Sequence, residues 1–328
     1  MDMLSEISST RQSVGGRRTG RTKMSPLAWR EARWGLFFIS PWLIGFILFY
    51  VLPMIVSFGF SLFNFTLSNP EAASFIGLEN WRRMLSDPET WQAMWITFRF
   101  AIVSFPIGMG LAFSLAVLLN SKSLLGRNVF RTLFYAPTMV PFIASILIWA
   151  QVLNPNTGWI NRLLQSVGIQ AVGTNGLRWM DDPNLILISY TFIGIWGIGN
   201  TVLIYLASLQ GVPTELYEAS TIDGAGWWRR LWNITIPLVT PVIFYNLITS
   251  LVGLLQYFIV PWVLNNGNGY PEGSTNFYMV HFYKQAFTYQ NMGYGSSLAW
   301  LMFIVALGIT LFLFGTARYW VYYAGESK

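Results

Sequence analysis

The stretch from Phe100 to Asn120 reads FAIVSFPIGMGLAFSLAVLLN and contains no charged residue. A helix that crosses the hydrocarbon core of a bilayer, roughly 30 Å thick, needs about 20 apolar residues, and this stretch is long enough. Five more windows of similar length also lack charge: 35–60, 132–153, 184–209, 238–258 and 294–316. The sequence therefore predicts an all-α integral membrane protein with six transmembrane helices.

The composition agrees with a membrane protein and excludes several other classes. Hydrophobic residues make up 54% of the chain and charged residues only 10%, whereas a soluble domain carries roughly 25% charged residues. There is no cysteine and one histidine, His281, which excludes disulfides, thiolate catalysis, Cys/His zinc sites and a histidine-based triad. The net charge is +6, but the basic residues cluster in the N-terminal tail, so no nucleic-acid partner is expected.

The distribution of lysine and arginine predicts the orientation of the chain. Of the 20 Lys and Arg residues, fourteen fall in the tail, the even-numbered loops and the C-terminus, and positive charge marks the cytoplasmic side. Both termini are therefore expected in the cytoplasm. The predicted organisation is a basic, largely disordered cytoplasmic tail at 1–33, a six-span domain at 34–320 and a cytoplasmic C-terminal tail at 321–328.

The six windows lack the groups that an independent energy source requires. None contains Asp, Glu or His, although ion-driven carriers retain such a group within a span. No Gly-rich turn followed by Lys and Ser or Thr is present to bind nucleotide phosphates. Arg99 lies at the outer end of the second span, where it either snorkels to the interface or favours an anionic solute. An ion-coupled secondary carrier and a membrane-embedded transferase or protease are kept as alternatives.

The loop at 211–237 has the pattern of two short helices joined by a bend. Thr214 is expected as the N-cap of the first helix, which should end at Gly224. The second helix is expected from Trp227 to Ile236, ending where Pro237 meets the fifth span. Such an elbow, parallel to the membrane, is suited to a partner's cleft. The alternative is an interfacial hairpin held by its tryptophans: Trp227, Trp228 and Trp232.

A spaced motif runs through this loop. Glu218-Ala219-Ser220, three residues, Gly224, nine residues and then Ile234-Thr235-Ile236-Pro237 resemble the EAA motif of inner-membrane permease subunits of ABC importers. The chain departs from that motif at Ser220 and Ile236. The segment 215–226 resembles the carbohydrate branch, namely the first permease of maltose-type and glycerol-phosphate-type importers. The resemblance extends over about 34–320.

This resemblance implies a type I ABC importer permease core in the bacterial cytoplasmic (inner) membrane, with the elbow as a coupling helix that docks on a cytoplasmic ATPase. The chain itself would have no catalytic or metal site and no cofactor, because ATP and Mg are used by the partner subunits. The implied partners are a second permease, two ATP-binding cassette subunits, and a periplasmic or extracellular solute-binding protein. The ATPase-coupling residues would be Glu215, Glu218, Ala219, Ser220, Asp223, Gly224 and Gly226.

The candidate solute site combines aromatic rings, amides and helix breaks. Transporter sites lie near the midplane where Gly or Pro interrupts a helix, and sugars need aromatic faces and neutral hydrogen-bonding groups. By position, all the candidates except Gln256 match sugar-lining positions of the maltose-type permease; the alternative is helix packing. The expected substrate is an oligosaccharide or sugar derivative, and Arg99 leaves room for an acidic one such as alginate. The candidates are Thr138, Phe142, Trp196, Gly197, Asn200, Gly253, Leu254, Gln256 and Tyr257.

Overall fold

The computed structural model describes residues 26–121, 123–168 and 177–323, and their regular structure is almost entirely helical. The chain divides into two compact units, residues 1–56 and 57–328, and each is described by itself. Most of the predicted N-terminal tail and residues 324–328 of the predicted C-terminal tail lie outside the described residues.

The first unit is helical throughout its described part. It contains α1 (Pro26–Phe46), the π-helical turn η1 (Ile47–Val51) and the start of α2 (Leu52–Ser61). The helical stretch 26–61 has 36 residues and a mean hydropathy of 2.3, and it contains the first predicted span. The helix begins nine residues before that window because the polar residues at 26–34 are compatible with a helix although they are not apolar.

The second unit is a bundle around one long helix. Two short strands, β1 (Phe63–Asn64) and β2 (Ser74–Phe75), pair antiparallel near its start. Short 3₁₀ turns are η2 (Pro70–Ala72) and η3 (Ala136–Met139), and π turns are η4 (Leu231–Thr235) and η5 (Lys284–Thr288). The helices are α3 (Glu79–Ser86), α4 (Pro88–Asn120), α5 (Arg127–Tyr135), α6 (Phe142–Val152), α7 (Trp159–Ser166), α8 (Ile186–Trp196), α9 (Gly199–Gln210), α10 (Thr214–Ile222), α11 (Trp227–Arg230), α12 (Ile236–Leu255), α13 (Ile259–Asn265), α14 (Tyr278–Tyr283) and α15 (Met292–Trp320).

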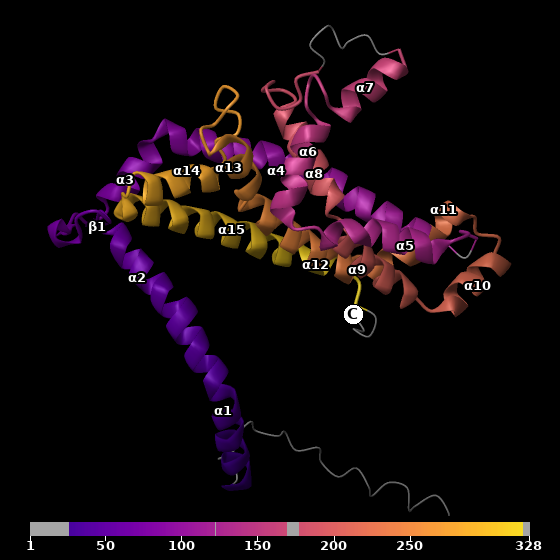
Figure 1. Cartoon of the computed structure of the whole chain (residues 1–328). Helices are drawn as coiled ribbons and strands as arrows, with labels where there is room; N and C mark the ends of the chain where they lie inside the picture. Colours follow the sequence, from indigo (N-terminus) through magenta and orange to yellow (C-terminus); the bar gives the residue numbers. More distant parts are fainter. Residues whose placement is uncertain (1–25, 122, 169–176, 324–328) are drawn as a thin grey trace, which may run out of the picture. The chain divides into compact units, whose positions relative to one another are not determined.

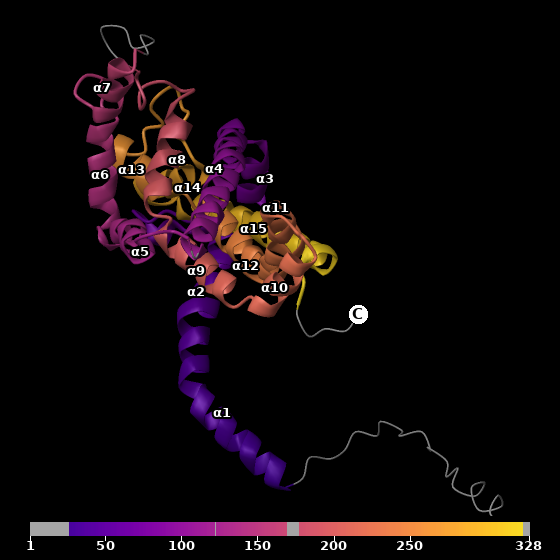
Figure 2. The same ribbon diagram turned by 90° about the vertical axis from the view of Figure 1, so that its right-hand side faces the viewer.

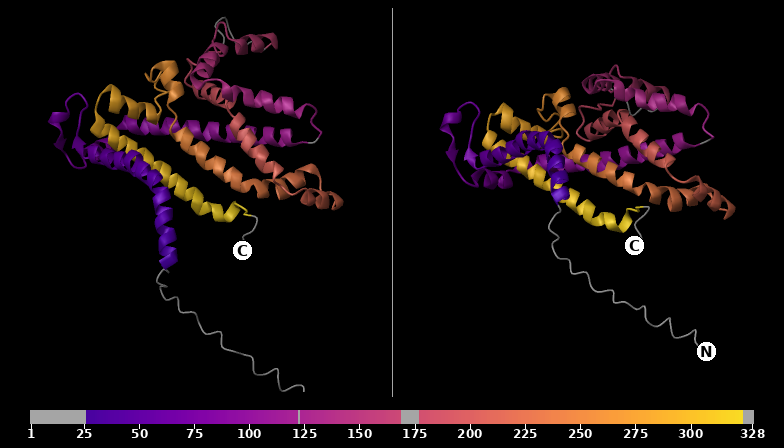
Figure 3. Two further views of the ribbon diagram at one scale, coloured as in Figure 1. Left: turned by 60° about the horizontal axis from the view of Figure 1, so that its bottom comes forward. Right: turned by 90° about the horizontal axis from the view of Figure 1, so that it is seen from below.

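Helix α4 is the axis of this bundle. Its 33 residues span about 50 Å at 1.5 Å per residue, which exceeds the thickness of a bilayer core. The helix starts where the Asp87 side chain accepts a hydrogen bond from the Glu89 backbone N–H at 2.9 Å. It packs against α8, α9, α12 and α14. Figures 1 and 3 show α3 at one end of α4 and the α10–α11 elbow at the other.

Two of the predicted spans are strongly bent. By length and hydropathy the described residues contain four membrane-spanning helices, or up to six if each bent pair counts as one span. The α5–α6 pair bends by 102° and the α8–α9 pair by 56°, and both bends lie within the spans predicted at 132–153 and 184–209. Pro137 and Pro141 break the first pair, because proline lacks a backbone donor. Figure 2 shows α6 turning away from α5.

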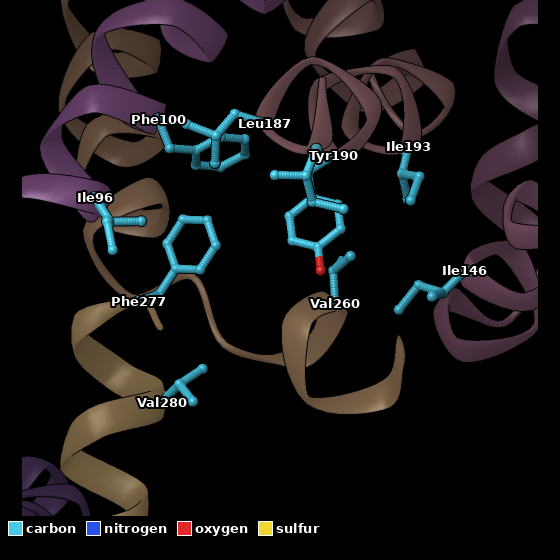
Figure 4. Packing of buried hydrophobic residues seen from close by; sticks show 10 residues of the cluster. Ile96, Phe100, Ile146, Leu187, Tyr190, Ile193, Val260, Phe277 and Val280 are labelled. Carbon is cyan, nitrogen blue, oxygen red and sulfur yellow. The ribbon is translucent and has the colours of Figure 1, made fainter. Parts of the chain in front are cut away.

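Aromatic rings form a core beside the first half of α4. Phe100 of α4 contacts Phe277 edge-to-face with centroids 5.3 Å apart, and Tyr190 of α8 stacks on Phe277 at 6.1 Å. Figure 4 shows these rings together with Ile146 of α6 and Val260 of α13. A second core lies toward the elbow, where small and aliphatic residues of α4 pack against α9 and α12. The two cores fix α8, α9 and α12 around α4.

Candidate functional site

A close approach between η3 and α9 fixes the break between α8 and α9. A Cβ atom on Gly199 would lie 2.5 Å from the carbonyl oxygen of Phe134 and 2.9 Å from Cγ2 of Thr138. Glycine is therefore required for α9 to start at this point. The contact joins the two bent pairs at their breaks, where two of the three predicted site segments lie.

A cavity of about 260 Å³ lies between α4, α8, α9 and α12. Three predicted residues of α12 and the segment after it line it: Gly253, Leu254 and Tyr257. The sequence analysis missed the remaining lining residues, which come mainly from α4 and α8. They are Phe100, Ser104, Phe105, Gly108, Met109, Tyr190, Thr191, Gly194, Ile195, Ile198, Thr201 and Ser250.

The cavity is mostly apolar with a few hydroxyl groups. Ser104 Oγ and Thr191 Oγ1 lie 2.6 Å apart and form a buried hydrogen bond across α4 and α8. The Tyr257 hydroxyl is buried and has no hydrogen-bond partner among the described residues. Thr201 and Ser250 add further hydroxyls. An apolar cavity with a few convergent polar groups is typical of a small-molecule site, and hydroxyls within apolar spans are the signal that would have indicated it.

The other predicted solute residues do not line this cavity. Trp196 is 44% exposed and contacts Trp149 edge-to-face at 5.6 Å. Phe142 is 47% exposed, Asn200 is exposed, and the Thr138 hydroxyl donates to the carbonyl of Tyr135 at 2.7 Å. Gly197 and Gln256 are exposed as well. These residues do not line this cavity of the single chain, so their role in solute binding stays a prediction.

The elbow has the predicted two helices, with two differences at their ends. Helix α10 begins at Thr214, but its N-cap residue is Pro213 and makes no side-chain capping bond. Helix α11 ends at Arg230, but the helical backbone continues through the π turn η4 into α12 and does not end at Pro237. The extra residue of a π turn accommodates the missing donor of proline within a continuous helix.

The bend of the elbow is a Schellman motif. Gly224 has φ of +71°, and its N–H donates to the carbonyl of Thr221 at 3.1 Å while Ala225 N–H donates to the carbonyl of Ser220 at 2.9 Å. Inside the elbow, the hydroxyls of Tyr217 and Thr235 lie 2.9 Å apart. Six predicted coupling residues are exposed: Glu215, Glu218, Ala219, Asp223, Gly224 and Gly226.

Ser220 is the partly buried member of the predicted coupling set. Its hydroxyl donates to the carbonyl of Tyr217 at 2.8 Å, so the side chain is hydrogen-bonded within its own helix. The outer surface of the elbow instead presents Ile222, which is 89% exposed. The elbow thus combines carboxylates, small residues and exposed apolar side chains, of which Ile222 is the most exposed.

A buried polar junction joins α4, α14 and α15 at the opposite end. The Tyr294 hydroxyl donates to Asp87 Oδ2 at 2.6 Å, and the Thr90 hydroxyl donates to the same oxygen at 3.0 Å. His281 Nε2 lies 3.7 Å from Asp87 Oδ2, and His281 Nδ1 lies 3.9 Å from Glu89 Oε2. Sequence reasoning missed this junction because its members are distant in sequence.

The junction lowers the pKa of two groups, His281 and Asp87, and both shifts favour the deprotonated form. Desolvation lowers the pKa of His281 below its usual value, although the carboxylates of Asp87 and Glu89 partly oppose the shift. Desolvation alone would raise the pKa of Asp87, but hydrogen bonds from Tyr294, Glu89 and Thr90 outweigh it, so that pKa is lowered. His281 is therefore neutral and Asp87 ionised at neutral pH.

The long apolar helices, the hydroxyl-lined cavity between them and the free elbow define a multi-pass membrane transport protein. The chain belongs to the family of binding-protein-dependent transport system inner membrane components, whose model matches residues 104–326. Members of this family are non-catalytic permease subunits of ABC importers, which confirms that the chain is not an enzyme. The alternatives of an ion-coupled carrier and a membrane-embedded transferase are therefore set aside.

Curated relatives support this assignment over most of the chain. A probable ABC transporter permease of Bacillus subtilis, YesP, is 36% identical over 90% of this chain and 93% of its own length. The trehalose/maltose permease MalF of Thermococcus litoralis is 33% identical over 90% and 97%. The sulfoquinovosyl glycerol permease SmoG of Agrobacterium fabrum is 31% identical over 76% and 79%.

A solved structure shares the fold. In the crystal structure of a bacterial alginate ABC transporter in complex with alginate pentasaccharide-bound periplasmic protein, one chain superimposes with a TM-score of 0.73. That chain is 21% identical, and the match covers 88% of this chain and 96% of that chain. The two chains thus share their fold.

Proposed function

We propose that the chain forms, with a second permease, the translocation path of an ATP-driven importer for an oligosaccharide or sugar derivative. The free elbow carries this proposal, because its exposed Glu218, Ala219 and Gly224 keep the spacing of the ATPase-docking motif. Relatives that transport trehalose or maltose and sulfoquinovosyl glycerol support a sugar-type substrate. The remaining partners are two ATP-binding cassette subunits and an external solute-binding protein.

The proposed topology has six spans with both termini in the cytoplasm. In this arrangement α5–α6 and α8–α9 each cross once, and the coupling loop 211–237 lies in the cytoplasm beside the end of α4. The bend between α8 and α9 supports this proposal, because both helices line the cavity and broken helices at membrane depth are tolerated where they line a protein cavity. The six-span domain is then 34–320, between the two cytoplasmic tails.

The proposed solute path has two parts. Gly253, Leu254 and Tyr257 line the cavity within this chain, and the exposed Trp196 and Asn200 face the path shared with the second permease. Tyr257→Phe removes the unpartnered hydroxyl, and Asn200→Ala removes an amide from the exposed part. Both variants should take up saccharide with lowered affinity while ATPase assembly is unchanged. Wild-type affinity in both would rule out this path.

The coupling role is tested at Gly224. Gly224→Asp adds a side chain and a negative charge at a left-handed position with φ of +71°, so the elbow should lose its fit to the ATPase. We expect normal membrane insertion and loss of substrate-stimulated ATP hydrolysis in the reconstituted complex. Gly126→Asp is the matched control, because Gly126 has the same φ of +71° but lies before α5, outside the elbow. Normal coupled hydrolysis in Gly224→Asp would contradict the proposal.

A further inference from the structure

A second cavity of about 310 Å³ lies behind the elbow, between it and the ends of α4 and α9. We call it the rear cavity. It shares no lining residue with the hydroxyl-lined cavity, and Ile222 does not line it. The lining residues are Val117, Asn120, Ser121, Leu209, Tyr217, Trp227, Arg230, Leu231 and Thr235.

Among the described lining residues, one is charged, namely Arg230 with its guanidinium. Its Nη1 donates to Thr221 Oγ1 at 3.1 Å. Its Nε is buried and has no hydrogen-bond partner among the described residues, and within the same residues Arg230 forms no ion pair with a carboxylate. A buried donor without a partner is costly, so the guanidinium that lines the cavity has hydrogen-bonding capacity left for an acceptor.

Further polar residues line the same cavity. Asn120 carries an amide, Ser121 and Thr235 carry hydroxyls, and Trp227 carries an indole N–H. A cationic cavity of this composition fits an anion with several acceptor oxygens. The Nε–Nη2 edge of a guanidinium is the fork that pairs with two oxygens of one phosphate.

We propose that the rear cavity binds a phosphate group, carried either by an anionic phospholipid or by free phosphate, with Arg230 as the cationic anchor. The position of the elbow supports the lipid source. Trp227, Trp228 and Trp232 are 52%, 67% and 62% exposed, and exposed tryptophans mark the headgroup level of a membrane. A phosphate bound there bridges the end of α4 and α11, and so restrains the elbow from behind.

This proposal does not depend on the identity of the transported solute or of the ATPase, so it is tested on the full chain alone. The chain is purified in detergent, and bound lipid is counted by native mass spectrometry after addition of phosphatidylglycerol or phosphatidylcholine. Inorganic phosphate is tested in parallel by its effect on thermal unfolding. Arg230→Gln is compared with Arg229→Gln, because Arg229 is exposed and does not line the cavity.

Loss of the charge-assisted pair should weaken binding about tenfold in Arg230→Gln and leave Arg229→Gln unchanged. Selective loss of phosphatidylglycerol supports a phospholipid, and selective loss of stabilisation by inorganic phosphate supports the free ion. Val117→Phe keeps Arg230 and fills the cavity, so it should block binding as well while the chain still unfolds cooperatively. Equal weakening in both arginine variants would overturn the proposal. Absence of binding to phosphatidylglycerol, phosphatidylcholine and inorganic phosphate would overturn it as well.

Discussion

At the scale of single residues, Gly199 decides whether the two helix breaks can meet. Gly199→Ala would place Cβ 2.5 Å from the Phe134 carbonyl oxygen, which forces the backbone apart and should destabilise the protein by about 1–3 kcal/mol. Gly194→Ala is the matched control, because nothing lies within 4 Å of its added Cβ. Thermal unfolding of the two purified variants measures the difference. Equal stability of both would show that η3 and α9 are not held in this contact.

His281 makes stability depend on pH. Its pKa is lowered in the folded state, so the unfolded chain binds more protons below about pH 6.5. The stability contribution is therefore present above that pH and is lost as pH falls through 6.5 toward the folded-state value. In His281→Gln, the midpoint temperature of thermal unfolding should depend less on pH between about pH 5 and 8. An unchanged pH dependence in this variant would assign the effect to other groups. The pKa of Asp87 is also lowered, but its contribution to stability is lost only at lower pH.

At the scale of elements, the Schellman motif controls the end of α10. Gly224→Ala forces a side chain into the left-handed region, at a cost of about 1–2 kcal/mol, and should free the Ala225 N–H that donates to Ser220 at 2.9 Å. Hydrogen exchange at Ala225 should then rise by roughly tenfold. Gly226→Ala should leave that exchange unchanged, because Gly226 has φ of −67° and open space around its Cβ. Equal exchange in both variants would contradict the motif.

The elements also show what sequence patterns can and cannot predict. Charge-free windows located the apolar parts of α4, α12 and α15, because the hydrophobic length requirement is a property of each segment alone. The Gly224 bend was predictable for the same reason, since only local conformation is involved. The cavity was predicted only in part: Tyr257 lies in it and Trp196 does not. Which helix faces share a cavity depends on the rotation and bend of each helix, and these are set by contacts between distant residues.

At the scale of the whole molecule, α7 distinguishes six spans from four. If α5–α6 and α8–α9 each cross the membrane, α7 lies outside; if neither crosses, it lies inside. The chain has no cysteine, so single cysteines report without background. Leu163 of α7 is 62% exposed, and the controls Tyr270 and Ile222 are 44% and 89% exposed. A membrane-impermeant maleimide applied to intact spheroplasts should label Leu163→Cys and Tyr270→Cys, and should label Ile222→Cys only after permeabilisation. If Leu163→Cys is not labelled in intact spheroplasts while Tyr270→Cys is, the chain has four spans and the bent pairs are re-entrant hairpins. That result would remove the solute path proposed between α4, α8, α9 and α12.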